Sequence, residues 1–109
     1  MSNMTNRLFE TKRQLQELGV VMSDNEYSSK MLGKSSRYVS WLKATGHDPA
    51  IDAMVMLYIK LDDLHDKCVV TKRVAMSAIV DDMSTGVWES IRQSMLDIKE
   101  DYDKKQLIA

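Results

Sequence analysis

The sequence predicts an all-α protein, and three observations carry this prediction. Apolar residues recur every three or four positions along almost the whole chain, which is the period of an amphipathic helix. Alternating apolar and polar residues, which would indicate a half-buried strand, form only short runs. The 109 residues include four glycines and one proline, so few chain reversals are expected. The length corresponds to a single domain, since domains cluster at roughly 100–150 residues.

Two helices are expected at the start of the chain. The first runs from about Thr5 to Leu18, and Gly19 follows it where a left-handed C-terminal cap is favoured. The apolar side of this helix consists of Met4, Leu8, Leu15 and Leu18. The second begins with a capping box, in which the Ser23 hydroxyl accepts the Glu26 amide hydrogen and the Glu26 carboxylate returns to the Ser23 amide. Gly33 ends this second helix.

A third helix is expected to begin at Ser35 or Ser36, either of which can cap it, and to end at Thr45-Gly46. Val39 and Leu42 lie three positions apart, so they can face the interior together. The sequence therefore predicts a short helix that is anchored by two apolar side chains.

The fourth helix is expected to start at Asp48-Pro49, an N-cap followed by proline at the first helical position. Its apolar face is the strongest amphipathic pattern in the chain and consists of Ile51, Met54, Val55, Tyr58, Leu61 and Leu64. Two alternatives stay open for His65–Met83: Thr71 caps a separate helix, or the fourth helix continues with a kink. Ser84-Thr85-Gly86 is expected to break the pattern before a final helix from about Val87 to Lys105.

The final helix carries an apolar stripe at spacings of three, four, three and four, which is typical of a helix–helix seam over two heptads. The stripe consists of Trp88, Ile91, Met95, Ile98 and Tyr102. One interpretation is that it forms the interface of a homodimer. The alternative is that it packs on its own domain.

Residues 23–64 form the most informative unit, because a capped helix, a glycine turn, a second helix and a packing helix follow one another. Ser23–Gly33, Ser35–Lys43, Gly46–Pro49 and Ile51–Leu64 carry this pattern. It resembles the lambda-repressor-like (Cro/repressor-type) helix-turn-helix domain and small bacterial helix-turn-helix proteins. The resemblance implies a compact helix-turn-helix domain of four to five helices over residues 1–66. A C-terminal amphipathic helical extension, with dimerisation as one interpretation of its role, would then follow over residues 67–109.

Three features depart from the usual pattern of that family. Ser28 stands where a small residue, often alanine, is usual, and Lys34 stands where an apolar residue usually follows the glycine. The stretches before Gly33 and before Gly46 are each about one residue longer than usual. The spacing therefore supports the fold more directly than it supports an ordinary docking geometry.

The resemblance implies a small transcriptional regulator that binds specific sequences of double-stranded DNA, with the helix at 35–45 as the recognition helix. Such a helix needs outward donors for base edges and phosphates. The candidate DNA-binding residues are Lys30, Lys34, Ser35, Ser36, Arg37, Tyr38, Ser40, Trp41 and Lys43. The alternatives are a solvated helix face, with Tyr38 or Trp41 turned into the core, or a helical protein–protein adaptor that keeps the fold without binding DNA.

The net charge of −1 conceals an asymmetry. Residues 1–60 carry a net charge of +2, residues 61–109 carry −3, and the stretch 26–47 carries +3. Because salt screens charges beyond roughly 8–10 Å, a local excess can attract phosphates on a chain that is nearly neutral. A protein of this charge is expected to bind DNA with modest affinity.

Other classes of function find little support in the sequence. His65 and Cys68 are too few to hold a metal, since zinc needs three or four ligands. No converging acid–base set and no phosphate-binding glycine loop occurs, so no enzyme, cofactor or small-molecule substrate is expected. The start of the chain lacks the apolar core of a signal peptide, and no run approaches the roughly 18 apolar residues of a membrane span. With Cys68 as the single cysteine, we expect a cytoplasmic protein that does not enter a membrane.

Overall fold

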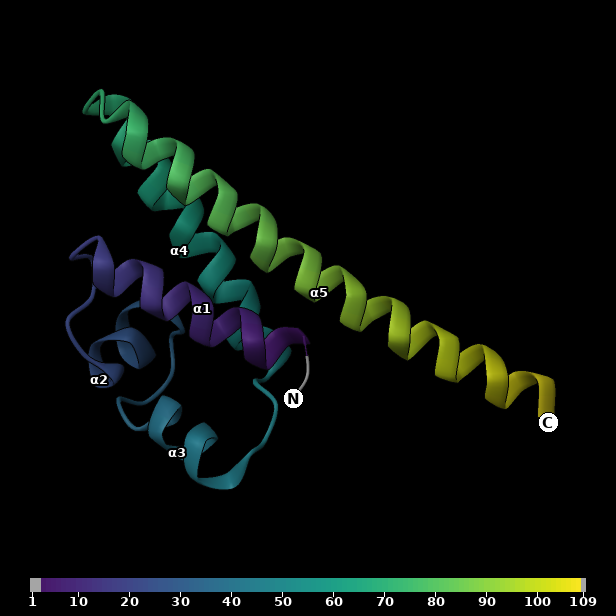
Figure 1. The fold of residues 1–109 in the computed structure, drawn as a ribbon. Coiled ribbons are helices and arrows are strands. Elements are labelled where there is room, and N and C mark those ends of the chain that lie inside the picture. Colours follow the sequence, from purple (N-terminus) through teal and green to yellow (C-terminus); the bar gives the residue numbers. More distant parts are fainter. Residues whose placement is uncertain (1–2, 109) are drawn as a thin grey trace.

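The computed structural model describes residues 3–108, and these residues form helices and connecting turns without any strand (Figure 1). The predicted all-α fold is therefore confirmed. In chain order the elements are α1 (Asn3–Glu17), α2 (Asp24–Glu26), the π-helix η1 (Tyr27–Met31), α3 (Tyr38–Thr45), α4 (Ile51–Val70) and α5 (Val74–Ile108).

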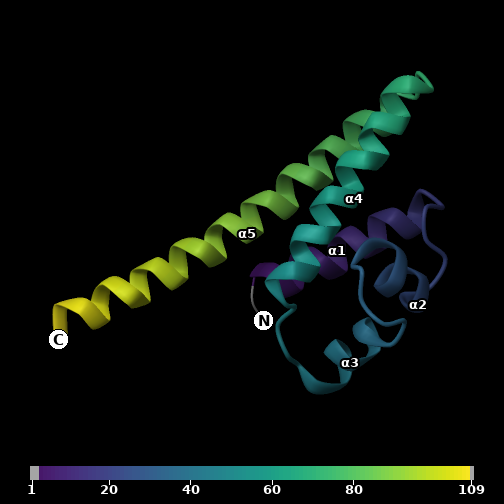
Figure 2. The ribbon, with the colours of Figure 1, turned by 180° about the vertical axis from the view of Figure 1, so that it is seen from behind.

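The most extensive packing joins α4 and α5, which form an antiparallel hairpin (Figures 1 and 2). α1 packs against α5, and α2 and α3 lie on the side of α1 that faces away from α5. The core between these helices contains side chains from all of the longer helices, including Leu8, Leu15, Leu57, Leu61 and Val87, each fully buried. Burial of such side chains stabilises the fold by roughly 1.5–3 kcal/mol each.

The helix ends that depend on local signals lie where the sequence places them. The Ser23 hydroxyl accepts the Glu26 amide hydrogen at 3.1 Å, as expected of a capping residue. The other half of the predicted capping box is wrong: the Glu26 carboxylate does not return to the Ser23 amide but lies 3.6 Å from the Lys30 ammonium. Gly46 ends α3 with a φ of +70°, a backbone conformation that glycine adopts without strain.

The stretch before Gly33, which the helix-turn-helix resemblance predicts to be about one residue longer than usual, contains the π-helix η1. The Leu32 amide donates to the Tyr27 carbonyl at 3.2 Å, so this turn spans five residues instead of four. Tyr27 and Ser28 are consecutive residues, and both are fully buried. The wider turn therefore brings two neighbouring side chains into the interior.

The predicted start of α3 is wrong by about two residues. Ser35 and Ser36 do not cap the helix; the N-cap position is occupied by Arg37, without a side-chain cap. The Ser35 carbonyl accepts the Tyr38 amide hydrogen at 3.1 Å, which closes a turn before the helix begins. The helix at 35–45 that the sequence predicts as a recognition helix is therefore shorter in the structure and covers 38–45.

The predicted start of α4 is also wrong. The helix begins at Ile51 after Ala50, and Asp48 is used elsewhere: its carboxylate accepts a hydrogen bond from the Thr5 hydroxyl of α1 at 2.9 Å. Of the predicted apolar face, Met54 and Leu61 are buried and Tyr58 and Leu64 are half-buried, whereas Ile51 and Val55 are exposed.

A tight turn separates α4 from α5, which decides between the two alternatives for residues 65–83. Thr71 ends α4 instead of starting a new helix, because its hydroxyl donates to the Lys67 carbonyl at 2.8 Å. Lys72 then adopts a φ of +61°, and α5 begins at Val74. The fourth helix therefore ends before the apolar residues of 74–83, which belong to the next helix.

The expected break at Ser84-Thr85-Gly86 is wrong, because α5 continues through it without interruption. The small residues instead allow α1 to approach closely. A β-carbon on Gly86 would lie 2.6 Å from the Arg7 guanidinium of α1. The Ser90 hydroxyl is buried in the same place, 3.3 Å from the Asn3 side-chain oxygen of α1. Small side chains here reflect helix packing and not a turn.

The second half of α5 extends beyond the rest of the molecule (Figure 1). The helix has 35 residues, which corresponds to about 52 Å, and the molecule measures 55 Å along its longest axis. Among the side chains of 74–106, Ile91 is the last buried one of α5, and all the side chains of 95–106 are exposed. Residue 66, where the predicted division into two parts falls, lies inside α4.

Candidate nucleic-acid interface

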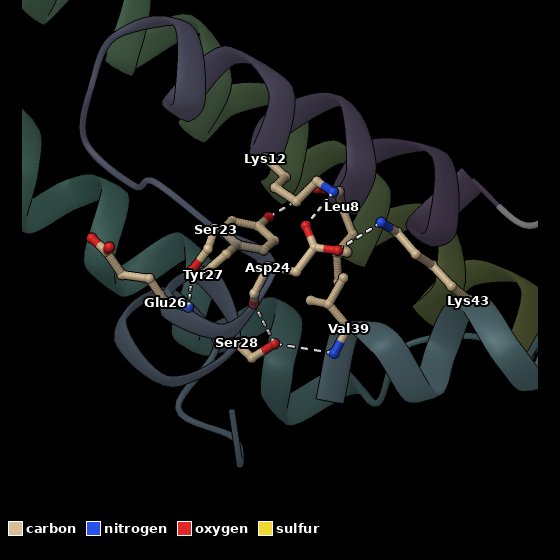
Figure 3. A network of polar contacts seen from close by, with 9 residues as sticks. All are labelled: Leu8, Lys12, Ser23, Asp24, Glu26, Tyr27, Ser28, Val39 and Lys43. Atoms are coloured by element: carbon tan, nitrogen blue, oxygen red, sulfur yellow. Dashed lines mark hydrogen bonds and ion pairs between the residues drawn. The ribbon is translucent and has the colours of Figure 1, made fainter. Parts of the chain in front are cut away.

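α3 is fixed to the domain by its two predicted inward residues and by a hydrogen bond that the sequence did not predict. Val39 and Leu42 are 0% and 3% exposed, as expected. The buried Ser28 hydroxyl accepts the Val39 amide hydrogen at 3.0 Å and donates to the Asp24 carbonyl at 2.8 Å (Figure 3). Ser28, one of the departures from the family pattern, thus connects the start of α3 to the helix before it.

Asp24 connects three helices. Its two carboxylate oxygens lie 2.7 Å from the Lys12 ammonium of α1 and 2.6 Å from the Lys43 ammonium of α3 (Figure 3). The hydrogen bond from Lys12, and to a smaller extent that from Lys43, holds the pKa of Asp24 below its ordinary value. The bond between Asp24 and Lys43 raises the pKa of Lys43. The cluster therefore favours the charged forms of Asp24 and Lys43 and sets the position of α3 relative to α1.

A buried tyrosine attaches the helix before α3 to α1. The Tyr27 hydroxyl donates to the Leu8 carbonyl at 2.8 Å, and its ring is fully buried (Figure 3). Burial strongly raises the pKa of this hydroxyl, because the charged form would lose its solvation. The hydroxyl is therefore a permanent donor within the scaffold that carries α3.

The predicted DNA-binding residues gather on and around α3, and most of them face solvent. Ser35, Ser36, Arg37, Ser40, Trp41 and Lys43 are exposed, as is Lys30 on η1, while Lys34 and Tyr38 are half-buried. The structure therefore brings most of the predicted set to one region of the surface, whereas Lys30 lies beside Val20, Lys60 and Lys67 at a separate pocket.

The aromatic side chains of α3 form a row on the surface. The rings of Tyr38 and Trp41 stack with centroids 6.0 Å apart, and those of Trp41 and His47 stack at 4.9 Å. The Tyr38 hydroxyl accepts the Ala50 amide hydrogen at 2.9 Å, so Tyr38 also fixes the segment that leads into α4. Trp41 is 47% exposed, which excludes the alternative that it is a core residue.

The three lysines of the candidate set are paired with carboxylates. Lys34 contacts Asp52 at 2.7 Å, which raises the pKa of Lys34 and lowers that of Asp52. Lys43 contacts Asp24, and Lys30 contacts Glu26. Residues 24–52 contain four basic and four acidic residues, so the local excess of positive charge disappears once these partners are counted.

Arg37 differs from the lysines. It is exposed, and among residues 3–108 the structure gives its guanidinium no carboxylate partner. It stands at the N-cap of α3, at the end of the helix that a recognition helix presents to base edges. Arg37 is therefore the cation of the candidate set that is best placed to meet a ligand.

A groove of about 430 Å³ lies between the end of α3 and α1. It is lined by Thr5, Phe9, Leu42, Lys43, Gly46, His47 and Asp48. The ammonium groups of Lys12 and Lys43 lie 5.5 and 6.0 Å from the centre of the Phe9 ring. The groove therefore has an apolar floor and a charged rim, directly beside the aromatic row.

Comparison with known families places the chain in one of them. A family model described as "Family of unknown function (DUF6626)" matches residues 8–102. The chain belongs to the DUF6626 family. No curated protein and no solved structure matches it.

The DUF6626 match includes α2, η1, α3 and α4 completely, and most of α1 and α5. On α5, the predicted dimer stripe divides into two parts. Ile91 is 3% exposed and packs in the core of its own chain. Trp88, Met95, Ile98 and Tyr102 are 44–62% exposed. The Trp88 ring also contacts the Tyr58 ring of α4 at 5.7 Å, so the stripe begins at the edge of the core.

Three further observations on the described part of this DUF6626 chain concern metal-binding side chains, the cysteine and membrane-spanning helices. No group of three or more metal-binding side chains occurs among residues 3–108. Cys68 is buried. None of the helices described is both long and apolar enough to cross a membrane.

Sequence reasoning missed Asp24, Ser28, His47 and Asp52 as parts of the candidate interface. Asp24 and Ser28 were missed because they belong to a predicted capped helix, in which polar and small residues are expected without any role in an interface. Asp52 and Asp24 are 18 and 19 positions from the lysines that they contact, so no helical spacing could reveal them. For His47 the sequence did contain a usable signal, namely its position directly after Gly46. A left-handed cap reverses the chain and returns the next side chain toward the helix.

Proposed function

We propose that this protein binds double-stranded DNA and regulates transcription, with α3 inserted into the major groove. One observation supports this most strongly. α3 is a short exposed helix, held at its base by buried contacts, and its Arg37 has no carboxylate partner among the described residues. The order of the helices agrees with the helix-turn-helix resemblance, since α2 and η1 lead through a glycine turn into α3. In this proposal Arg37, Ser40 and Trp41 face base edges.

The paired lysines are compatible with this role. Lys34 and Lys43 are held by exposed or half-exposed ion pairs, and such pairs contribute little, with a median of about 0–1 kcal/mol. A phosphate group can therefore replace the carboxylate as the partner of either lysine. The carboxylates remain close by and repel phosphates, so the expected affinity is modest and strongly dependent on salt.

The proposal is tested by selecting duplexes from a random pool and measuring the affinity of the selected site at several salt concentrations. Arg37→Ala is expected to weaken binding by about 1–3 kcal/mol and to relax specificity at one base pair. Arg73→Ala is the matched control, because it removes the same charge from the exposed α4–α5 turn, far from α3 (Figure 1). The proposal fails if no salt-dependent binding occurs at low ionic strength, or if the two variants behave alike.

A protein–protein adaptor is the second candidate, and the ion pairs of the lysines favour it. A surface whose lysines are already paired, beside an aromatic row and a groove with an apolar floor, is suited to an apolar partner. Exposed aromatic side chains are frequent anchors in such interfaces.

The two candidates differ in their response to charge. Reversal of charge at Lys34, Arg37 and Lys43 is expected to abolish DNA binding, whereas an adaptor interface centred on Trp41 would survive it. Trp41→Ala tests the adaptor, because an adaptor would lose the aromatic side chain that anchors its protein partner and would bind that partner more weakly. A purified chain that binds no DNA, and whose partner binding depends on Trp41 but not on these charges, would support the adaptor.

A further inference from the structure

We propose that the exposed half of α5 pairs with the same segment of a second copy of this chain, in a parallel and in-register arrangement. This inference concerns the end of the molecule opposite to the α4–α5 turn and does not depend on DNA binding. It rests on the exposed part of the stripe, on the position of the charges around it, and on the continuity of the stripe with the core.

The stripe continues a face of α5 that is already a packing surface. Val80, Val87 and Ile91 of this face are buried against α4 and α1. Met95, Ile98 and Tyr102 follow at helical spacing. They are 46%, 62% and 61% exposed, because this part of α5 extends past the first residue of the antiparallel α4. An apolar face that is covered for half its length is thus left uncovered for the other half, which leaves it available to another helix.

Within residues 95–104 the charges lie away from the stripe, and four of them are paired within the helix. The Lys99 ammonium lies 3.7 Å from the Asp103 carboxylate, and the Lys104 ammonium lies 3.1 Å from Glu100. The Gln93 amide donates to Asp97 at 3.1 Å. Pairs at this spacing stabilise a helix that has few tertiary contacts. The exposed half of α5 is therefore a preformed helix with one apolar side.

The spacing of the stripe identifies the partner as a helix, because steps of three and four form the narrow seam of a coiled coil. The residues that flank the seam identify its direction. In a parallel, in-register pair, Ser94 faces Lys99 of the second copy and Asp101 faces Gln106, so no like charges meet at these flanking positions. Like charges meet at Lys105, which follows Tyr102 in the seam, near the exposed end of the helix. In an antiparallel pair centred on this segment, Lys99 would face Lys99 and Asp101 would face Asp101. Sliding that pair by one heptad would place Arg92 opposite Lys99. Like charges across a seam disfavour both antiparallel registers.

The seam is short, since a firm coiled coil usually has three or four heptads. The dimer is therefore expected to dissociate on dilution. Parallel pairing also brings the two copies of α3 to the same end of the coil. This is the arrangement that two half-sites of a palindromic DNA sequence would require.

The test measures the mass of the full chain by light scattering or sedimentation over a range of concentrations. The wild type is expected to shift from 12.5 kDa towards twice that mass as the concentration rises. Ile98→Glu is expected to stay monomeric, because it places a charge in the seam. Leu96→Glu is the matched control: Leu96 is 48% exposed, lies outside the seam, and undergoes the same change of side chain. Ile98 is 62% exposed, so neither variant disturbs the core.

The relative direction of the two paired helices is tested with the variant Ile98→Cys under mild oxidation. The parallel arrangement places the two introduced thiols in the same layer and predicts a rapid disulfide between copies, while Leu96→Cys forms little. Cys68 is buried and is the single native cysteine, so it contributes little background.

Four results would each overturn the proposal. They are a monomer at all concentrations, equal behaviour of Ile98→Glu and Leu96→Glu, a trimer or tetramer, and a dimer in which Ile98→Cys forms no disulfide between copies. A chain that binds DNA as a monomer would refute this inference and leave the proposed function standing.

Discussion

Replacement of Ser28 by alanine is expected to destabilise the fold, although alanine is frequent at this position in the helix-turn-helix domains that the sequence resembles. The Ser28 hydroxyl is fully buried and accepts the Val39 amide hydrogen at 3.0 Å. Alanine would leave that amide buried without a partner, which costs about 1–3 kcal/mol. In a domain of this size each kcal/mol lowers Tm by roughly 4 °C, so a decrease of about 4–12 °C is expected.

Thermal and urea unfolding, followed by circular dichroism, measures the loss. Ser29→Ala is the control, because the Ser29 hydroxyl is exposed and donates only to carbonyls of its own helix, the nearer at 3.1 Å. Hydrogen exchange adds a local readout: the Val39 amide of Ser28→Ala should exchange faster relative to the wild type. If the free energy of unfolding of Ser28→Ala lies within about 0.5 kcal/mol of that of Ser29→Ala, the usual limit for surface substitutions, the assigned role of Ser28 is refuted.

Two further predictions concern the carboxylates around α3. Asp24→Asn is expected to cost roughly 1–2 kcal/mol at neutral pH, since it removes the charged acceptor of Lys12 and Lys43. The folded-state pKa of Asp24 is lowered, so its stabilisation is present above about pH 4 and is lost as the pH falls through the folded-state pKa. The stability of the variant, measured by urea unfolding, should therefore depend less on pH below about 4 than that of the wild type, and equal slopes would contradict the ion pair. Asp52→Asn is expected to leave Tm unchanged and to tighten DNA binding several-fold, because it frees Lys34 and removes a carboxylate from the interface. Unchanged or weaker binding would count against a phosphate contact at Lys34.

The parts of the fold that depend on neighbouring residues could be predicted from the sequence. Ser23 and Gly46 act within one helical turn of their own positions, and both lie where the sequence places them. Val39 and Leu42 needed only the helical period. The all-α class followed from the same period over the whole chain.

The errors arose where distant residues decide the local structure. Ser84-Thr85-Gly86 has the composition of a turn, but its glycine serves the crossing of α1, where Arg7 lies almost eighty residues earlier in the chain. Ser35 and Ser36 are good caps by type, yet the start of α3 is fixed by Ser28. Asp48 is a good cap as well, but it bonds to Thr5 of α1.

The same distinction applies to the candidate interface. The sequence predicted which side chains of α3 would face outward, because this depends on the helix alone. It overestimated the available positive charge, because Asp24 and Asp52 reach the lysines only after the chain has folded. Arg37 emerged as the distinctive cation only when the partners of the others were known.

The π-helix at Tyr27–Met31 has a consequence for the comparison of this chain with others. A single deletion between Tyr27 and Gly33 would restore an ordinary α-helical turn and rotate the preceding residues by about 100°. Ser28 would then no longer reach Val39, so the inserted residue and the serine depend on each other. Relatives that lack the insertion should carry alanine at this position, and relatives that keep it should keep a hydroxyl. The length of this one turn therefore indicates which residue type to expect beside it.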